Sequence, residues 1–136
     1  DNYKFELGKA SVLKEGKDAV IIASGPLVQE SLAAAELLKD ELDVGVINMS
    51  SIKPIDAEAI KKAARTGVII AAQDHNIFGG LGSAVAEVIA KENLNVKFNI
   101  VGIQDLFAES DTGEVLYRKY GLDAQGIAKI VKSLSK

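Results

Sequence analysis

The 136-residue chain has the length of one domain, and 48% of its residues are apolar, enough to build a core without disulfides or metal staples. It contains no cysteine, which excludes a disulfide framework, a thiolate nucleophile and a cysteine-ligated metal site, and which fits a reducing cytoplasm. The net charge is −3 and the lysines are interspersed with acids, so the chain has no basic stripe that would indicate a nucleic-acid partner.

The start of the chain indicates part of a larger protein. Residue 1 is Asp1, not an initiator methionine, and the first recognisable element begins within about ten residues. The longest apolar runs, residues 19–23 and 67–72, are too short to cross a bilayer, so no membrane association is expected. We therefore expect residues 1–136 to be a single soluble domain that belongs to a longer chain.

Apolar runs alternate along the chain with amphipathic segments. In chain order, the predicted elements are an edge strand over residues 9–13, a strand over 18–24, a helix over 27–38, a strand over 44–49, a helix over 57–65, a strand over 67–72, a helix over 83–92, a strand over 96–103, and helices over 114–120 and 123–134. Asp56 and Asp123 are predicted N-caps. Strands that are apolar throughout and alternate with helices indicate a mostly parallel sheet covered on both faces, which is a three-layer α/β/α sandwich.

Ser24 and Gly25 form the first turn from a strand to a helix. In a dinucleotide-binding fold this turn carries G-x-G-x-x-G, but only one of those glycines is present here. Asn48 also stands near the place where an acid would bind ribose. The pattern favours a tight turn required by the fold over an NAD site.

A glycine cluster, Gly79, Gly80 and Gly82, precedes Ser83 and the next predicted helix. Backbone N–H groups at such a position can receive an anion, helped by the helix dipole. The cluster matches neither a phosphate-binding P-loop nor a nucleophile elbow, so close packing or a positive φ is the favoured explanation for its glycines.

The one histidine, His75, lies next to Asp74 at the end of a predicted strand, where open α/β sheets place ligands. A single histidine makes neither a two-histidine metal site nor, without a suitable serine, a catalytic triad, so a structural or interface role is favoured. We assign no catalytic, cofactor-binding or metal-ligating residue. The candidate anion or interface site comprises Ser24, Gly25, His75, Gly79, Gly80, Gly82 and Ser83.

Four acidic residues near the C-terminal third could suggest a cation site: Asp105, Glu109, Asp111 and Glu114. Their spacing departs from that of a calcium-binding loop, so a solvated acidic loop is the better interpretation.

Six motifs, taken together and in order, resemble the C-terminal domain of transketolases. They occupy residues 18–25, 46–56, 73–75, 79–87, 102–107 and 120–127. The segments 105–110 and 116–123 are similar to transketolases and deoxyxylulose phosphate synthases and unlike the β subunits of 2-oxoacid dehydrogenases, and Glu109-Ser110 favours transketolase. Gln73 and Asp111 depart from the family, which usually has glutamate and glycine at these positions.

The resemblance implies a five-stranded mixed sheet with one antiparallel strand, at the end of a larger chain. In that family, two preceding domains of a homodimer hold thiamine diphosphate and a divalent cation, Mg²⁺ or Ca²⁺, and transfer a two-carbon ketol unit between sugar phosphates. The resemblance therefore implies a non-catalytic domain for dimer and interdomain packing, with no cofactor of its own and with a regulatory anion site as a further suggestion. Its partners would be the thiamine diphosphate-binding domains of the same enzyme or a companion subunit, in a homo-oligomer.

Two alternatives remain open from the sequence. The chain could be the C-terminal domain of a deoxyxylulose phosphate synthase. It could also be a freestanding module that binds an anion, a nucleotide or another polypeptide.

Overall fold

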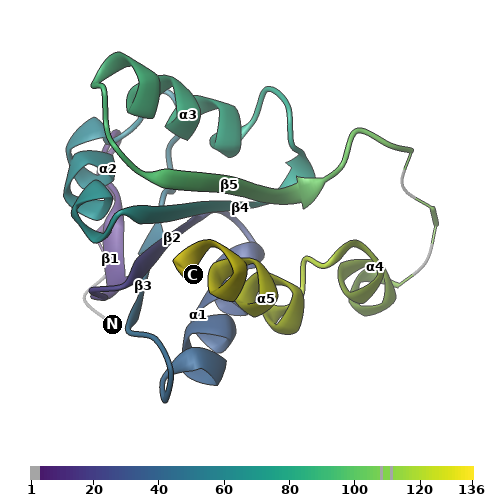
Figure 1. Cartoon of the computed structure of the whole chain (residues 1–136). Helices are drawn as coiled ribbons and strands as arrows, with labels where there is room; N and C mark the ends of the chain where they lie inside the picture. The colour runs from purple at the N-terminus through teal and green to yellow at the C-terminus, as the bar shows by residue number, and fades with distance from the viewer. Residues whose placement is uncertain (1–3, 108, 111) are drawn as a thin grey trace.

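A five-stranded sheet forms the middle layer of the protein. The computed structural model describes residues 4–107, 109–110 and 112–136. The strands are β1 (Ser11–Lys14), β2 (Ala19–Ala23), β3 (Val44–Asn48), β4 (Val68–Asn76) and β5 (Lys97–Ile103), in the spatial order β1-β3-β2-β4-β5 (Figure 1). β1 runs antiparallel to β3 and all other neighbours are parallel, which confirms the mixed, mostly parallel sheet.

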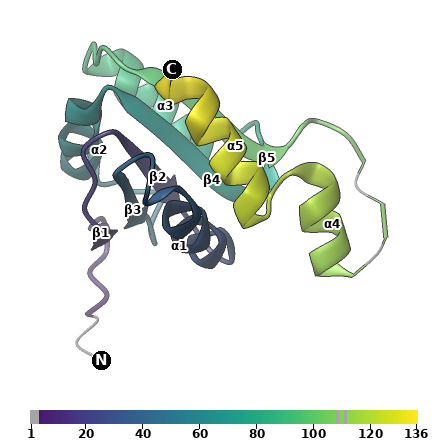
Figure 2. The same cartoon turned by 60° about the horizontal axis from the view of Figure 1, so that its bottom comes forward.

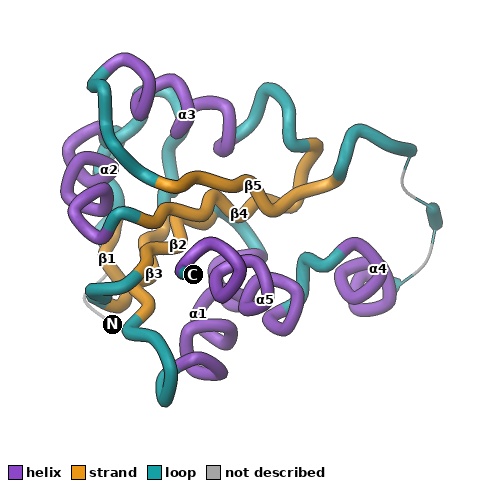
Figure 3. The backbone as a smooth tube through the Cα atoms, viewed as in Figure 1, coloured by secondary structure: helices purple, strands orange, loops and turns teal. Residues whose placement is uncertain are grey.

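Helices cover both faces of this sheet. They are α1 (Leu27–Leu38), α2 (Ala57–Ala63), α3 (Leu81–Lys91), α4 (Gly113–Tyr120) and α5 (Ala124–Ser135), with a 3-10 turn η1 (Ala64–Thr66) after α2. α1 and α5 pack on one face, and α2 and α3 on the other (Figures 1 and 2). Strands and helices alternate along most of the chain (Figure 3), so the predicted three-layer sandwich is confirmed.

The alternation of side chains along each strand divides the core in two. In β2, Ile21 faces α1 and α5, whereas its neighbours Val20 and Ile22 face α2 and α3. All five residues of β2 are buried because helices cover both sides of the strand. A central strand therefore has to be apolar throughout, which is the pattern that predicted it.

Both predicted aspartate caps are confirmed. The Asp123 carboxylate accepts a hydrogen bond from the Gly126 N–H at 2.9 Å. Asp56 accepts from Ala59 N–H and, across the fold, from Ala10 N–H, each at 3.0 Å. Burial by itself raises the pKa of Asp56, but these two backbone hydrogen bonds and the nearby Lys9 outweigh it and leave the pKa lowered.

Four predicted boundaries are wrong by two residues or more, the first being the start of β1, which lies at Ser11 instead of Lys9. β4 does not end at Ala72 but continues to Asn76, after an irregularity in its pairing with β5. α3 begins at Leu81 instead of Ser83, because Gly80 is extended and the Leu81 side chain enters the core. α2 ends at Ala63, two residues before the predicted end, and tightens into η1. In each case the backbone hydrogen bonds that define the element do not end at the same residue as the apolar residues that predicted it.

Candidate functional site

The residues predicted as an anion or interface site gather at one edge of the sheet. Ser24 and Gly25 follow β2, His75 lies near the end of β4, and residues 79–83 lead into α3. β2 and β4 are neighbours, and the helices that follow them leave toward opposite faces of the sheet. This is the topological switch point at which open α/β sheets bind ligands. The structure thus places these residues after the carboxyl ends of two neighbouring parallel strands.

Side-chain oxygens of this chain accept hydrogen bonds from the backbone N–H groups of the loop between β4 and α3. The N–H of Gly79 donates to Ser83 Oγ at 2.8 Å, and that of Phe78 donates to Asn76 Oδ1 at 2.9 Å. The N–H of Gly82 donates to Gln73 Oε1 at 2.7 Å. These three donors are already satisfied by side chains of the same chain, which leaves fewer N–H groups for an anion than the glycine cluster suggests.

The glycines in this loop are required by close packing and by conformation. Gly79 has a φ of +77°, in the region that favours glycine. A Cβ on Gly80 would lie 2.9 Å from Gln73 Oε1, and a Cβ on Gly82 would lie 2.5 Å from the Ile100 side chain. The loop is therefore drawn tightly against Gln73 and β5.

Gln73 organises this edge, and its role was missed from the sequence. Its side chain is 2% exposed, and besides accepting from Gly82 it donates from Nε2 to the Asn76 carbonyl oxygen at 2.5 Å. An amide supplies one donor group and one acceptor, so it satisfies both partners. A polar residue directly after the apolar run 67–72 is the signal that could have indicated this role.

His75 and Asp74 both lie on the exposed surface but have different partners. The ring Nδ1 of His75 is 2.8 Å from the Asn76 carbonyl oxygen. The hydroxyl of Tyr117 donates to Asp74 Oδ2 at 2.7 Å and connects α4 to the end of β4. Desolvation raises the pKa of Tyr117 to about 12, with a further contribution from the hydrogen bond to Asp74 and its charge. Asp74 therefore serves as the acceptor for a tyrosine.

Three of the four acidic residues considered above, Asp105, Glu109 and Glu114, are each bound by a donor of this chain. Asp105 accepts from Asn76 Nδ2 at 3.0 Å, and Glu109 and Glu114 form ion pairs with Lys119 and Arg118. Asp111 lies outside the described residues. Among the residues that the structure describes, no three histidine or acidic side chains gather to hold a metal ion. The described carboxylates of this segment therefore have partners within the chain itself.

Comparison with known proteins identifies this architecture. The model of the family "Transketolase, C-terminal domain" matches residues 8–127. The chain belongs to this family. The assignment confirms the resemblance inferred from the six ordered motifs.

The chain spans less than half the length of the curated relatives it matches. A putative transketolase C-terminal section of Methanocaldococcus jannaschii is 45% identical over an alignment of 134 residues, and the match covers 97% of this chain and 42% of the relative. The 1-deoxy-D-xylulose-5-phosphate synthase of Syntrophotalea carbinolica is 42% identical over an alignment of 129 residues, and the match covers 93% of this chain and 20% of the relative.

Solved structures agree with this transketolase fold. A split gene transketolase, described as an inactive beta4 tetramer, superposes with a TM-score of 0.93 at 42% identity and covers 98% of this chain and 44% of its own. A transketolase from Leishmania mexicana gives a TM-score of 0.71 at 24% identity, over 94% of this chain and 18% of its own, and supports the fold alone. No helix in the described part of the chain is long and apolar enough to span a membrane.

Proposed function

We propose that this chain is the non-catalytic C-terminal domain of a transketolase that transfers a two-carbon ketol unit between sugar phosphates. The observation that supports the proposal is the match to the split gene transketolase. The match covers 98% of this chain but only 44% of the chain of that transketolase. In the proposed enzyme, thiamine diphosphate and its divalent cation are held by domains outside residues 1–136.

Exposed apolar side chains near the switch point support a packing role. Phe78 in the loop after β4 is 63% exposed, and Leu106 and Phe107 in the segment after β5 are 44% and 102% exposed. The hydrogen bond between Asn76 and Asp105 joins these two segments. Apolar side chains left in water at one edge of a domain are typical of a surface that another domain covers. We assign this edge, with His75 and the glycine loop, to interdomain or dimer contact.

The partners proposed for this surface are the thiamine diphosphate-binding domains, on the same chain or on a companion subunit, within a cytoplasmic homo-oligomer. Several relatives are themselves named as subunits or as a C-terminal section, including the 6-deoxy-6-sulfo-D-fructose transketolase subunit of a Clostridium species, 39% identical over 138 residues. Such names favour a natural polypeptide or assembly larger than 14.4 kDa.

The test is to fractionate an extract of cells that make the protein by size and to follow the domain with an antibody. We expect the antigen on a polypeptide or complex well above 14.4 kDa, in the fractions that transfer a two-carbon ketol unit between sugar phosphates. An antigen found only at 14.4 kDa and apart from that activity would contradict the proposal and favour a freestanding binding module.

A second candidate is the C-terminal domain of a 1-deoxy-D-xylulose-5-phosphate synthase, because such a synthase is 42% identical over 129 residues. The same fractions separate the two candidates. Formation of 1-deoxy-D-xylulose 5-phosphate that coelutes with the antigen, without ketol transfer between sugar phosphates, would favour this synthase.

A further inference from the structure

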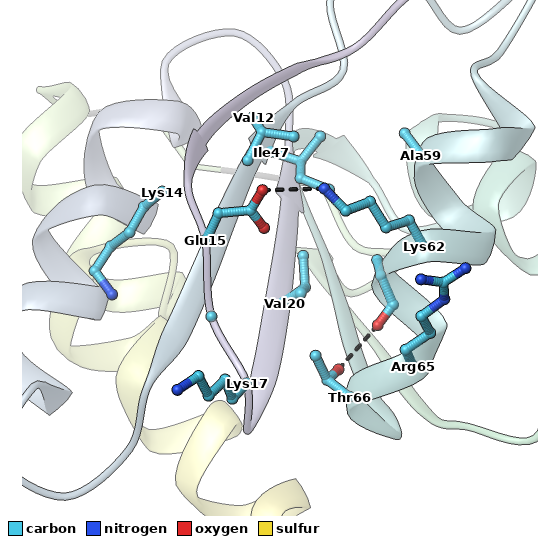
Figure 4. Close-up of a pocket in the computed structure, with 12 residues that line it drawn as sticks. Val12, Lys14, Glu15, Lys17, Val20, Ile47, Ala59, Lys62, Arg65 and Thr66 are labelled. Carbon is cyan, nitrogen blue, oxygen red and sulfur yellow. Dashed lines mark hydrogen bonds and ion pairs between the residues drawn. The ribbon is translucent and has the colours of Figure 1, made fainter.

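A hollow lies near the amino end of β2, whereas the glycine loop follows the carboxyl end of β4. It occupies about 310 Å³ between the turn from β1 to β2, the first residues of β2, and α2 with η1 (Figure 4). Small-molecule sites of proteins begin at about 300 Å³ and are mostly apolar, with a few polar groups that orient the ligand. The hollow is on the α2 side of the sheet.

Three adjacent strands make an apolar floor. Val12 of β1 and Ile47 of β3 are cross-strand partners, so their side chains share one face, and Val20 of β2 lies beside them. Val20 and Ile47 are each 5% exposed, whereas Val12 is 45% exposed because nothing in the described chain covers it from above. An apolar group placed here would remove the exposed part of this floor from water.

The wall formed by α2 leaves the hollow open because two of its residues are alanines. Ala59 and Ala63 are four positions apart and so lie on the same side of the helix, facing the floor. An alanine side chain ends at Cβ, so the helix does not fill the space between itself and β1. A leucine at position 59 would project into that space.

The rim carries more positive than negative charge, in a chain whose net charge is −3. Lys62 reaches from α2 to Glu15 in the turn after β1, with Nζ and Oε1 3.0 Å apart (Figure 4). No carboxylate of the described residues pairs with Arg65 or with Lys17. Lys14 is occupied elsewhere, since its Nζ donates to the Val44 carbonyl oxygen at 2.8 Å.

The turn that carries Glu15 and Lys17 is fixed in place. A Cβ on Gly16 would lie 2.0 Å from the Gly45 backbone nitrogen, so the turn sits directly against β3 and only glycine fits there. The rim thus has one fixed side, the turn, and one helical side that carries Lys62 and Arg65. The two sides are joined by a single exposed ion pair, and such pairs contribute at most about 1 kcal/mol.

We propose that this hollow binds a small organic anion, with its apolar body on the floor of Val12, Val20 and Ile47 and its phosphate or carboxylate group at Lys62 and Arg65. The anionic group replaces Glu15 as the partner of Lys62. A hydrogen bond between two charged groups is stronger than one between neutral groups, and Arg65 adds a second cation that the Glu15 carboxylate does not engage. The site is distinct from the edge assigned to interdomain contact.

The experiment titrates phenyl phosphate into the isotope-labelled chain and follows backbone amide shifts, with inorganic phosphate and benzyl alcohol as separate probes. We expect saturable shifts at Gly16, Lys17 and residues 62–66 with phenyl phosphate, and binding at least about tenfold weaker with either half-probe, a difference of about 1.4 kcal/mol. Equal affinity for inorganic phosphate would mean an adventitious ion only and would overturn the proposal.

Variants separate the apolar and the charged contributions. Ala59→Leu fills the hollow and Lys62→Gln removes the cation, so each is expected to weaken phenyl phosphate binding by about tenfold or more. Glu15→Gln removes the competing carboxylate and is expected to tighten binding several-fold. The matched control is Lys61→Gln, which removes a neighbouring lysine of α2 that pairs with Glu58 instead of lining the hollow.

Thermal unfolding of each variant shows whether it folds. If Ala59→Leu does not fold, the opposite effects of Glu15→Gln and Lys62→Gln still decide the matter. Unchanged or weaker binding by Glu15→Gln would overturn the proposal, and so would shifts confined to the start of α3. Calorimetry on the complete enzyme must give the same affinity for phenyl phosphate. If the isolated 136-residue chain binds phenyl phosphate and the complete enzyme does not, another polypeptide covers the hollow and the proposal is overturned.

Discussion

Replacing Gln73 by glutamate tests how the switch-point edge is held together. The amide is 2% exposed, its Oε1 accepts from Gly82 N–H at 2.7 Å, and its Nε2 donates to the Asn76 carbonyl oxygen at 2.5 Å. In Gln73→Glu an ionised carboxylate would keep the first bond but would place negative charge against the Asn76 carbonyl. Only the protonated carboxyl can donate to that oxygen, so burial and this contact both raise its pKa in the folded state.

The size and sign of the effect follow from linkage. An upward shift of about two pKa units corresponds to about 2.7 kcal/mol. Because the folded-state pKa lies above the unfolded value of about 4.3, the folded state of the variant binds the proton more tightly, and stability is lost as pH rises through the folded-state pKa. We expect Gln73→Glu to match the parent below about pH 4.3 and to be about 2 to 3 kcal/mol less stable at pH 7.

The assay is urea unfolding of both chains, followed by circular dichroism at several pH values between about 4 and 8, with the difference in free energy of unfolding taken at each pH. Taking the difference removes the titration of groups that the two chains share. Gln73→Met, which has neither a hydrogen-bonding amide nor a titratable group, serves as the control and should lose a constant amount across this range. A Gln73→Glu difference in the free energy of unfolding that does not change with pH would show instead that the carboxylate ionises freely at this position.

Four further substitutions, the last of them a control, test other parts of the structure. Tyr117→Phe is expected to lower the free energy of unfolding by about 0.5 to 1.5 kcal/mol and to remove the tyrosine that titrates near pH 12 in ultraviolet absorbance. Because the pKa of Tyr117 is raised in the folded state, the stabilisation by this tyrosine should fade above about pH 10. An unchanged ultraviolet titration in the variant would contradict this assignment. Asp56→Ala should lower the free energy of unfolding in urea by about 1 to 3 kcal/mol at pH 7. Because the pKa of Asp56 is lowered in the folded state, this loss should shrink as the pH falls through that pKa. A loss that is the same at every pH would argue against the charged cap. Gly82→Ala should lower the free energy of unfolding by about 1 to 3 kcal/mol in the same assay, because its Cβ would meet the Ile100 side chain. The control is Gly113→Ala, whose Cβ meets nothing within 4 Å and which should be neutral or stabilising by up to about 1 kcal/mol. Equal effects of the two substitutions would contradict the close packing at Gly82.

The layered fold could be predicted because its central strands are buried on both faces. The run 18–24 reads as a strand since every side chain of β2 has to be apolar, and Asp56 and Asp123 are recognisable caps because each directly precedes an amphipathic segment. The edge strand β1 is less distinctive: the resemblance to a family implied one antiparallel strand, but the pairing of β1 with β3 is known only from the structure.

The details of the switch-point edge could not be predicted because they depend on contacts between distant residues. The spacing of Gly79, Gly80 and Gly82 shows that glycine is needed, but not that Gln73 and Ile100 are what limit the space. The hollow beside α2 was missed entirely, since Ala59 is an ordinary helix residue in the sequence. The effect of Ala59 depends on how α2 is placed relative to β1 in the fold, and no local sequence pattern predicts that placement.

We propose that the chemistry of the parent enzyme lies outside this chain. Calorimetric titration of thiamine diphosphate with Mg²⁺ into the 136-residue chain tests it most directly, with the complete enzyme from the activity-bearing fractions as the positive control. We expect saturable binding by the complete enzyme and no saturable heat with the chain alone. Saturable micromolar binding by the chain alone would contradict it.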